Sequence, residues 1–596
     1  MDNYYFSMKY EESLSIKDKK SMGIYYTPQI IVTYILEEIL SKHNIIENPQ
    51  PKILDLSCGC GNFLLEAYDI LYKMIDENME KIKKKYGINY IKNINTHIIE
   101  NCIYGVDIDK NAINIFKKGL NYKKKLNDNK EDEISIINTN ISCEDGLKKE
   151  YSIKFDYIIG NPPYVGHKTL DKDYKKYLLR EYKDVYKDKA DLYFCFYKKA
   201  LDLISEDGKI GYISPRYFIE SPSGYNLRNY LFNCSNIEKI IDLSGANVFK
   251  NIGVSPVIIF FSKTNKNKEV ENIIKVYKNK TDKININKIN KFIDLLKCEE
   301  CEKISIKQKD LRKNWILVNK EVKDFFEKIE NKCTYTLEDI VISFQGIISG
   351  CDKAFILKKD DERINNIEKD ILKLWIKNKN ISSYVIEESK HKIIYSNDIK
   401  NLEDYIYIKE NCFLPYKEKL ENRRECKLNI RKWYELQWGR EKSLFERKKI
   451  MYPYKSAGNR FAIDYNNSYC SADVYSFYIK EEYIDEFSLE YLLGLLNSNI
   501  YDKYFKIMAK DMGNKIYDYY PNKVMKIKIF KDENYDEIED LSKQIIHNKL
   551  NIQRLKKEKN LQDKEVTFNK EIYYLENESH FLENRISKLI KKSLNL

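Results

Sequence analysis

The sequence predicts three successive kinds of structure: an α/β domain with a largely parallel sheet, a mixed α+β region, and a helical tail. Residues 50–263 alternate strand-like and helix-like apolar runs, which is typical of a sheet covered by helices. Between about residues 336 and 530 this alternation gives way to short strand-like runs, glycine turns and aromatic–basic clusters. Residues 536–596 are highly charged, with apolar residues at helical spacing, which predicts one or two long helices arranged as a hairpin.

The elements of the α/β domain follow in order along the chain. Apolar spacing predicts a helix over residues 29–42, after a Thr27–Pro28 start signal. Residues 51–71 predict a strand, a glycine turn and a helix, and residues 103–120 a strand with acidic residues at its end and another helix. Further strands are predicted at residues 134–141, 155–160, 209–215, 237–243 and 255–263, with helices at 191–204 and after 215.

We place the boundaries of the three regions after residues 275 and 535. Residues 264–335 are rich in Lys and Asn and poor in Pro and Gly, so they predict a transition with local structure. No internal repeat is found in the sequence.

The composition excludes several classes of protein. The chain has 596 residues, of which 43% are hydrophobic and 13% aromatic, enough for folded cores in three or four domains. No run approaches the length that a membrane helix needs, and the N-terminus does not resemble a secretory signal. The 13 cysteines lack framework spacing, which favours a reducing cytoplasm. The single C-x-x-C pair, Cys298 and Cys301, lacks the further ligands of a zinc site.

The net charge of +12 permits an anionic partner such as nucleic acid but does not require one. The chain has 90 Lys and 13 Arg, a bias that an AT-rich genome explains. The few Arg are the more informative cations, because Lys cannot replace a guanidinium fork.

A first group of candidate site residues follows two predicted strands. In residues 55–63 (DLSCGCGNF) a strand ends at Asp55, and Gly59 and Gly61 let the backbone pass close to a ligand. The next strand ends at Asp107, where an acidic side chain typically binds ribose hydroxyls. Position 64 is Leu, so the G-x-G-x-x-G phosphate fingerprint is not met. An adenosine cofactor without a pyrophosphate, such as S-adenosylmethionine (SAM), fits this pattern better than a dinucleotide.

Two further segments complete the predicted cofactor site. Asp145 is expected to accept a hydrogen bond from the adenine amino group, although an ordinary turn explains it equally well. Residues 23–28 (GIYYTP) predict a lid over the amino-acid end of the cofactor, or alternatively a helix N-cap. No metal is expected. The predicted cofactor residues are Tyr25, Tyr26, Thr27, Asp55, Ser57, Gly59, Gly61, Asn62, Phe63, Asp107, Ile108, Asp145, Asn161 and Pro163.

Residues 161–164 (NPPY) form the sharpest motif of the chain. They follow the strand at 155–160, at the carboxyl edge where α/β sites assemble. We expect the Asn161 side chain and the Pro162 carbonyl to accept one hydrogen bond each from an exocyclic amine, and Tyr164 to stack on the base that carries it. Catalysis would then be mainly positioning and hydrogen bonding, without a strong general base. The alternative is a rigid turn between a strand and a helix.

An amine inside a DNA duplex can be reached only if its nucleotide is flipped out. Phe249 is the candidate for a second flat side chain opposite Tyr164, although a phenylalanine in this segment more commonly belongs to the core. His167, just past NPPY, is expected to be a solvated or DNA-backbone residue rather than a base.

The order GIYYTP, DLSCGCG, GVDID and NPPY, followed by a long C-terminal region, resembles the gamma-class N6-adenine DNA methyltransferases. The resemblance covers about residues 20–263 motif by motif. It implies a Rossmann-like SAM-dependent methyltransferase domain over residues 1–275, a target-recognition domain over 276–535 and a helical segment over 536–596.

The same resemblance implies roles for single residues. Thr27 and its neighbours would hold the methionine end of SAM, Asp107 the ribose and Asp145 the adenine. Asn161 and Pro162 would bind the target amine. Tyr164 and Phe249 would sandwich a flipped adenine.

Further segments look like the clostridial orphan adenine methyltransferases linked to sporulation, among them SFQGIISGCDKAF, ENRRECK and IRKWYELQWGRE. That subgroup implies a bacterial, epigenetic enzyme that methylates an adenine in a short, A-rich, non-palindromic site. About 22 residues precede GIYYTP, too few for a nuclease domain, and no Pro-Asp dipeptide occurs. Both observations favour a stand-alone enzyme, which we expect to be a monomer.

A second candidate surface lies in residues 423–460, which hold six of the 13 Arg among Trp, Tyr and Lys residues. Guanidinium groups bind phosphates and the edge of guanine, and aromatic side chains stack on bases. The amide of Gln437 could bind the edge of adenine. A salt bridge or a core position explains each residue equally well, but the cluster predicts a surface for double-stranded DNA. The predicted residues are Arg423, Arg424, Arg431, Trp433, Tyr434, Gln437, Trp438, Arg440, Arg447, Lys448, Lys449, Tyr452, Tyr454, Lys455 and Arg460.

Several functions stay open at this point. NPPY also serves the methylation of RNA bases and of protein glutamine. The chain would alternatively be the methylase of a restriction–modification system with a separate nuclease, or a DNA-binding protein with an inactive methylase fold. The C-terminal helices would be a packing or clamp element, or a partner-binding coiled coil.

Overall fold

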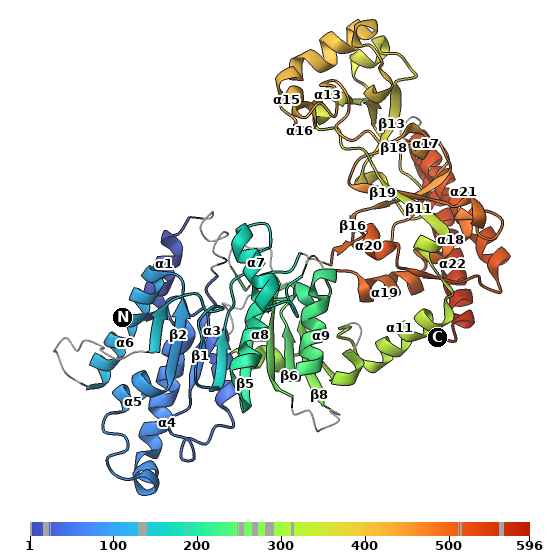
Figure 1. Cartoon of the computed structure of the whole chain (residues 1–596). Helices are drawn as coiled ribbons and strands as arrows, with labels where there is room; N and C mark the ends of the chain where they lie inside the picture. Colours follow the sequence, from blue (N-terminus) through green and yellow to red (C-terminus); the bar gives the residue numbers. More distant parts are fainter. Residues whose placement is uncertain are drawn as a thin grey trace. The chain divides into compact units, whose positions relative to one another are not determined.

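A computed structural model describes residues 3–15, 23, 25–128, 140–187, 189–246, 248–249, 255–264, 272–279, 291–311, 315–510, 512, 515–559 and 565–596. The chain divides into two compact units, Met1–Lys320 and Glu321–Leu596 (Figure 1). Each unit is described by itself.

The first unit contains a nine-stranded sheet in the order β3-β2-β1-β4-β5-β7-β6-β8-β9. The strands from β3 to β5 pair in parallel, as do β6 and β8. β7 runs antiparallel to β5 and β6, and β9 antiparallel to β8. The bounds are β1 Ile53–Asp55, β2 Ile103–Asp107, β3 Asn140–Cys143, β4 Phe155–Gly160, β5 Ile204–Pro215, β6 Ser235–Asp242, β7 Pro256–Lys263, β8 Ile273–Asn279 and β9 Cys301–Lys307.

This sheet confirms the predicted α/β order, and the motif-bearing strands all lie in its parallel part. Most of the predicted strand at 134–141 lies outside the described residues, and β3 begins at Asn140. β8 and β9 extend the sheet past residue 275, so the first unit runs further than the boundary placed there.

Helices cover both faces of this sheet (Figure 1). Successive residues of a strand point to opposite faces. Ile158 therefore packs with α8 (Tyr193–Leu203) and α9 (Tyr225–Cys234), and Ile159 with α3 (Gln29–Leu40) and α4 (Asn62–Tyr86). The other helices are α1 Asn3–Ser13, α5 Ile94–Asn101, α6 Lys110–Asp128, α7 Lys172–Glu181 and α10 Phe292–Lys297.

The second unit contains two four-stranded sheets, β11-β19-β15-β17 and β12-β14-β13-β18, and the pairs β10-β21 and β16-β20. Its strands are β10 Tyr335–Thr336, β11 Val341–Gln345, β12 Ile356–Lys358, β13 Leu372–Ile376, β14 His391–Ile394, β15 Lys449–Pro453, β16 Lys455–Ser456, β17 Ala462–Asp464, β18 Tyr469–Cys470, β19 Val474–Ile479, β20 Tyr517–Asp518 and β21 Lys528–Ile529. Its shorter helices are α11 Lys320–Lys332, α12 Leu337–Ile340, α13 Asp352–Phe355, α14 Ile406–Ile408, α15 Lys417–Glu421, α16 Arg424–Lys427, α17 Lys442–Phe445, α18 Leu489–Asn497, α19 Asn499–Met508 and α20 Pro521–Val524.

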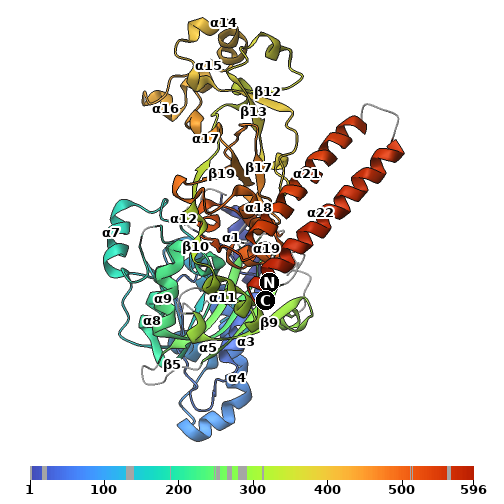
Figure 2. The same ribbon diagram turned by 90° about the vertical axis from the view of Figure 1, so that its right-hand side faces the viewer.

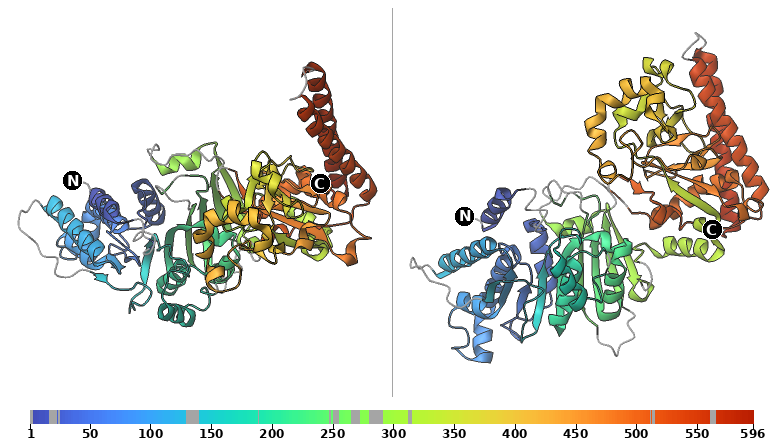
Figure 3. Two further views of the ribbon diagram at one scale, coloured as in Figure 1. Left: turned by 90° about the horizontal axis from the view of Figure 1, so that it is seen from above. Right: turned by 45° about the horizontal axis from the view of Figure 1, so that its top comes forward.

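The chain ends in two long helices, α21 (Tyr535–Lys559) and α22 (Glu565–Ser593), which lie side by side (Figures 2 and 3). They confirm the predicted helical hairpin. Ile538 of α21 and Ile586 of α22 are fully buried in the same core as Leu492 of α18. The hairpin is therefore an integral part of the second unit. None of the described helices is long and apolar enough to cross a membrane.

Candidate functional site

A cavity of about 410 Å³ lies in the first unit at the carboxyl ends of β1, β2 and β4. Asp55 ends β1, Asp107 ends β2, and Asn161 directly follows β4; all three line the cavity. Parallel strands bring their carboxyl ends to one edge of a sheet, which explains why residues far apart in sequence meet here. Every predicted cofactor residue lines this cavity except Gly61.

Gly61 has a different reason to be glycine. Its φ is +84°, and a Cβ there would lie 2.1 Å from the ring of Phe116 in α6. The residue therefore permits close packing of α4 against α6, and its predicted approach to a ligand stays a prediction. Gly59 does line the cavity, and its N–H donates to Asp107 Oδ2 at 2.8 Å.

The cavity is acidic. Asp55, Asp107, Asp109 and Asp145 line it, and Lys148 is the one cation among its described lining residues. Four acidic side chains against one cation disfavour a phosphate-bearing ligand and favour one with hydroxyl, amino or cationic groups. This donor set fits the predicted adenosine cofactor without a pyrophosphate.

Burial perturbs the carboxyl groups of this cavity. It raises the pKa of Asp55 to about 8 and also raises the pKa of Asp107 above its usual range. The Asp107 carboxylate accepts the N–H of Asp109 at 2.9 Å as well as that of Gly59. Asp145 Oδ1 accepts the N–H of Leu147 at 2.9 Å.

Several lining residues were not predicted. Tyr174 comes from α7, Phe196 from α8, and Lys148 from the turn after Asp145. Tyr10 of α1 donates from its hydroxyl to Asp109 Oδ2 at 2.5 Å, which brings the N-terminal helix to the rim. The i, i+4 spacing of Leu192 and Phe196, both in the lining, was the available sequence signal.

The NPPY loop leaves β4 through a strained position. Gly160 has a φ of +139°, and a Cβ there would lie 2.6 Å from Asp55 Oδ1. A side chain at this position would collide with the carboxylate of the neighbouring strand. Glycine therefore lets the loop begin directly against Asp55.

Asn161 is held with one amide atom engaged and the other free. Its Nδ2 donates to the carbonyl of Tyr25 at 2.7 Å. Its Oδ1 is buried and accepts no hydrogen bond from any described residue. A buried carbonyl oxygen without a donor is costly, so this atom is poised to accept a hydrogen bond from a bound ligand.

Three aromatic rings gather beside Asn161. The ring centroids of Tyr25 and Tyr164 are 5.2 Å apart, and those of Tyr164 and Phe249 are 6.1 Å apart at an interplanar angle of 79°. Burial holds the pKa of Tyr164 well above its usual range. Tyr164 and Phe249 meet edge to face, so one ring must turn before a base can lie between two parallel faces. The predicted sandwich stays a prediction.

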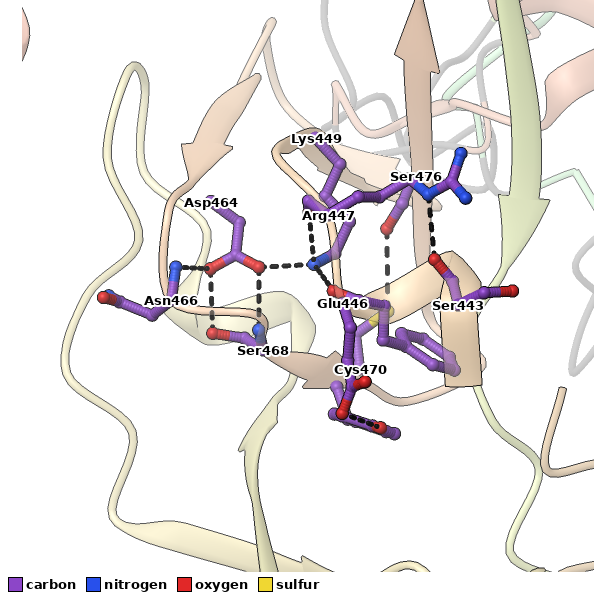
Figure 4. Close-up of polar contacts among 11 residues, drawn as sticks. Ser443, Glu446, Arg447, Lys449, Asp464, Asn466, Ser468, Cys470 and Ser476 are labelled. Atoms are coloured by element: carbon purple, nitrogen blue, oxygen red, sulfur yellow. Dashed lines mark hydrogen bonds and ion pairs between the residues drawn. The ribbon is translucent and has the colours of Figure 1, made fainter. Parts of the chain in front are cut away.

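Lys449 of the predicted DNA-binding cluster is fully buried. Its Nζ donates to the Asp464 carboxylate and, at 2.6 Å, to the Phe445 carbonyl (Figure 4). Asp464 also accepts the N–H and hydroxyl of Ser468 at 2.8 and 2.9 Å. The predicted DNA contact of Lys449 is therefore corrected to an internal ion pair.

Other members of the cluster are also internal. Arg423 is 8% exposed and donates to the carbonyls of Leu420, Trp433 and Glu435, and Tyr452 is fully buried. Their predicted DNA contacts are corrected in the same way. These arginine bonds organise the loop around residue 423.

Tyr434 and Gln437 are less available than predicted. Tyr434 is only 8% exposed, and its predicted DNA contact stays a prediction. Gln437 Nε2 donates to Glu425 Oε2 at 3.0 Å. A glutamine pairs with an adenine edge through both its amide N–H and its amide oxygen, and the amide nitrogen of Gln437 is already engaged.

The rest of the cluster reaches the surface. Arg424 and Lys448 are exposed, and Trp438 is 37% exposed. The guanidinium of Arg447 lies 4.1 Å from the centroid of the Tyr478 ring, a cation–π contact that fixes its direction. The half-buried members are Arg431, Trp433, Arg440, Arg447, Tyr454, Lys455 and Arg460.

No group of three or more His, Cys, Asp or Glu side chains that could hold a metal ion is found among the residues that the structure describes. Cys298 Sγ contacts the Leu295 carbonyl at 3.0 Å, and burial raises the pKa of this thiol.

The α/β sheet, its cavity and two family matches together indicate a mixed α/β methyltransferase fold with a C-terminal specificity domain. Residues 101–249 match the family described as Eco57I restriction-modification methylase. Residues 366–529 match the TaqI-like C-terminal specificity domain. The first match spans Asp107, Asn161 and Phe249, and the second spans the arginine cluster at 423–460.

The chain is similar to type II restriction–modification methyltransferases. It is 28% identical over 437 residues to the type II methyltransferase M.BstVI of Geobacillus stearothermophilus, covering 69% of this chain and 73% of that protein. It is 25% identical over 549 residues to M.BanIII of Aneurinibacillus aneurinilyticus, covering 85% and 88%.

Among solved structures, the type IIL restriction-modification enzyme MmeI in complex with DNA has a similar fold. The TM-score is 0.67 at 15% sequence identity, and the match covers 100% of this chain and 79% of that one. This likeness concerns the fold alone.

Proposed function

We propose that the chain is a site-specific DNA adenine-N6 methyltransferase that transfers the methyl group of SAM to an adenine flipped out of duplex DNA. The observation that carries the proposal is the buried Asn161 Oδ1, which has no donor among the described residues and lies at the edge of an acidic cavity. The similarity to type II DNA methyltransferases supports the substrate class.

We assign the lining residues to three parts of the cofactor. Asp107 would accept the ribose hydroxyls, Asp145 the adenine amino group, and Tyr25, Tyr26 and Thr27 would cover the methionine end. When bound, SAM supplies a methyl group on a sulfonium, which needs no further activation.

The chain's own residues then position the acceptor. The bond from Asn161 Nδ2 to the Tyr25 carbonyl would leave Oδ1 to accept a hydrogen bond from one amine N–H, and the Pro162 carbonyl would accept one from the other. Two acceptors hold the amine nitrogen with its lone pair toward the methyl carbon. The Tyr164 ring would stack on the base, with the Phe249 ring on its other face after one ring turns.

The biological setting has two candidates. The resemblance to the clostridial orphan subgroup supports a stand-alone enzyme with an epigenetic role, acting as a monomer on an A-rich, non-palindromic site. The similarity to type II restriction–modification methyltransferases favours the methylase of a system with a separate nuclease. A nuclease gene beside the coding gene would decide for the second.

Labelled SAM incubated with duplex DNA, RNA or release factor tests the substrate class. We expect label in DNA, located at adenine N6 by methylation-sensitive long-read sequencing. Label in RNA or protein alone would contradict the proposal.

Asn161→Ala tests the mechanism. It should lower methyl transfer about 100-fold or more, because it removes a preorganised hydrogen-bonding partner, and should leave DNA affinity unchanged. Asn229→Ala, at an exposed position on α9, is the matched control and should retain full activity. Equal activity of the two variants would refute the role of Asn161.

A further inference from the structure

Two segments of the second unit, residues 345–350 and 435–440, pair to form a small platform. Trp438 N–H donates to the Ile348 carbonyl at 2.9 Å, and Ile348 N–H donates back at 3.2 Å. The buried Arg423 guanidinium fastens this platform, because it donates to the carbonyl of Ser349 on one segment and that of Glu435 on the other. The platform is therefore rigid.

Arg440 ends this platform in an unusual conformation. Its φ is +62°, in the left-handed region where glycine is favoured over any residue with a Cβ. Its carbonyl accepts the Tyr395 hydroxyl at 2.7 Å, which helps to hold the strained backbone. Strain of this kind persists where the surrounding structure enforces it, commonly at ligand contacts.

The Arg440 side chain is oriented by neutral groups. Its Nη2 donates to Gln345 Oε1 at 3.0 Å and its Nε to the Gly346 carbonyl at 3.4 Å. No described carboxylate lies within salt-bridge distance, and burial lowers the pKa of this guanidinium. A half-buried cation with neutral partners alone is costly, and a ligand that supplies strong acceptors would offset that cost.

Two bonds to one side of the guanidinium leave the opposite edge open. No described residue accepts a hydrogen bond from Nη1, so Nη1 and the second proton of Nη2 present two parallel donors. This fork matches the O6 and N7 acceptors of guanine in the major groove. A phosphate tolerates many orientations of a cation, whereas a base edge requires a fixed one.

We propose that Arg440 reads a guanine in the target DNA and that Gln345 fixes its orientation. The proposal rests on the proposed function, because it takes double-stranded DNA as the ligand of the second unit. It adds a specificity-determining pair: Arg440 as the reading side chain and Gln345 as a positioning residue.

Selection of bound duplexes from a random library by the full-length protein tests this without requiring catalysis. The wild type should select a site with an invariant G·C pair. Arg440→Gly and Arg440→Lys should select the same site with that one pair degenerate, a loss of discrimination of roughly 5- to 150-fold. Gln345→Leu should relax the same position to a smaller extent.

Thermal unfolding separates reading from folding. Arg440→Gly relieves the left-handed strain, so its Tm should stay within a few degrees of the wild type. Arg440→Lys keeps the charge and serves as the second variant if the glycine variant unfolds. Unchanged selection by both variants, equal loss of binding to all sequences, or a wild-type site without an invariant G·C pair would overturn the proposal.

The two proposals can fail separately. A wild type that selects a G·C-containing duplex but transfers no methyl group to it would refute the methyltransferase function and leave the role of Arg440 standing. If the wild type methylates adenine but Arg440→Gly keeps the full G·C requirement, the role of Arg440 is refuted and the methyltransferase function stands.

Discussion

Lys449→Met tests whether a member of the cluster at residues 423–460 stabilises the fold or contacts DNA. Lys449 and Asp464 are direct cross-strand partners on β15 and β17, and both are at most 1% exposed. Methionine keeps the apolar stem but leaves the Asp464 carboxylate buried without its cation. Removing one partner of such a pair costs about 3–5 kcal/mol.

That cost should be visible in thermal unfolding of the full chain. At roughly 2–4 °C per kcal/mol for a domain of this size, the transition that includes the second unit should fall by about 6–20 °C. The fall should be similar in low and high salt, because a buried pair is little screened. Lys526→Met is the matched control: Lys526 and its partner Glu338 are both exposed, so its loss should cost at most about 1 kcal/mol.

Asp464→Asn and the double variant complete the cycle. The asparagine keeps an acceptor for Ser468 but isolates the Lys449 cation, so it should also be strongly destabilising. Replacing both partners by apolar residues should cost less than the sum of the two single changes. The opposite result would be a Lys449→Met protein with wild-type Tm whose salt dependence of DNA binding falls by about one ion, which would mark a phosphate contact and refute the internal role.

Two further predictions concern the first unit. Gly160→Ala should lower both Tm and methyl transfer, because its Cβ would lie 2.6 Å from Asp55 Oδ1. Gly166→Ala is the control and should be close to neutral, because a Cβ there meets no atom within 4 Å. Equal Tm values of the two variants would contradict the predicted collision. Asp55 has a folded pKa of about 8, above its ordinary value, so the folded state binds its proton more tightly than the unfolded state does. The wild type should therefore lose stability relative to Asp55→Asn as pH rises from about 4 to 8, and a Tm difference that stays constant between pH 5 and pH 9 would argue against this.

Most of the cavity lining could be predicted from the sequence because its residues follow strand ends. Asp55, Asp107 and Asn161 each lie at the end of an apolar run. Parallel strands bring such positions to one edge of the sheet, independently of the conformation of the connecting loops. Tyr174 and Phe196 were missed because they come from helices. Which face of a helix meets the sheet edge is set by packing of the whole layer, and a helical pattern alone leaves that rotation open.

The arginine cluster was predicted by composition, and composition does not reveal burial. Lys449 opens a strand whose five residues are all buried, and only its pairing with Asp464 shows why a Lys is tolerated there. Arg423 is similar: its partners are backbone carbonyls of residues 420–435, which carry no sequence signature. A satisfied internal cation and a DNA contact therefore look alike until tertiary pairing is known.

The two kinds of internal cation nevertheless differ in how much they contribute to the electrostatic potential outside the protein. The charge of Lys449 is cancelled by Asp464 at close range, so the pair adds little to the field outside the protein. Arg423 and Arg460 are satisfied by carbonyl, amide and hydroxyl oxygens, and no described carboxylate lies within salt-bridge distance of either. Glu425 partly offsets the charge of Arg423, whereas the charge of Arg460 adds to the potential that attracts a polyanion without its side chain having to touch it. The use of Arg at these two positions in an otherwise lysine-rich chain then has a structural reason, because a guanidinium can bind several neutral acceptors at once and keep its charge.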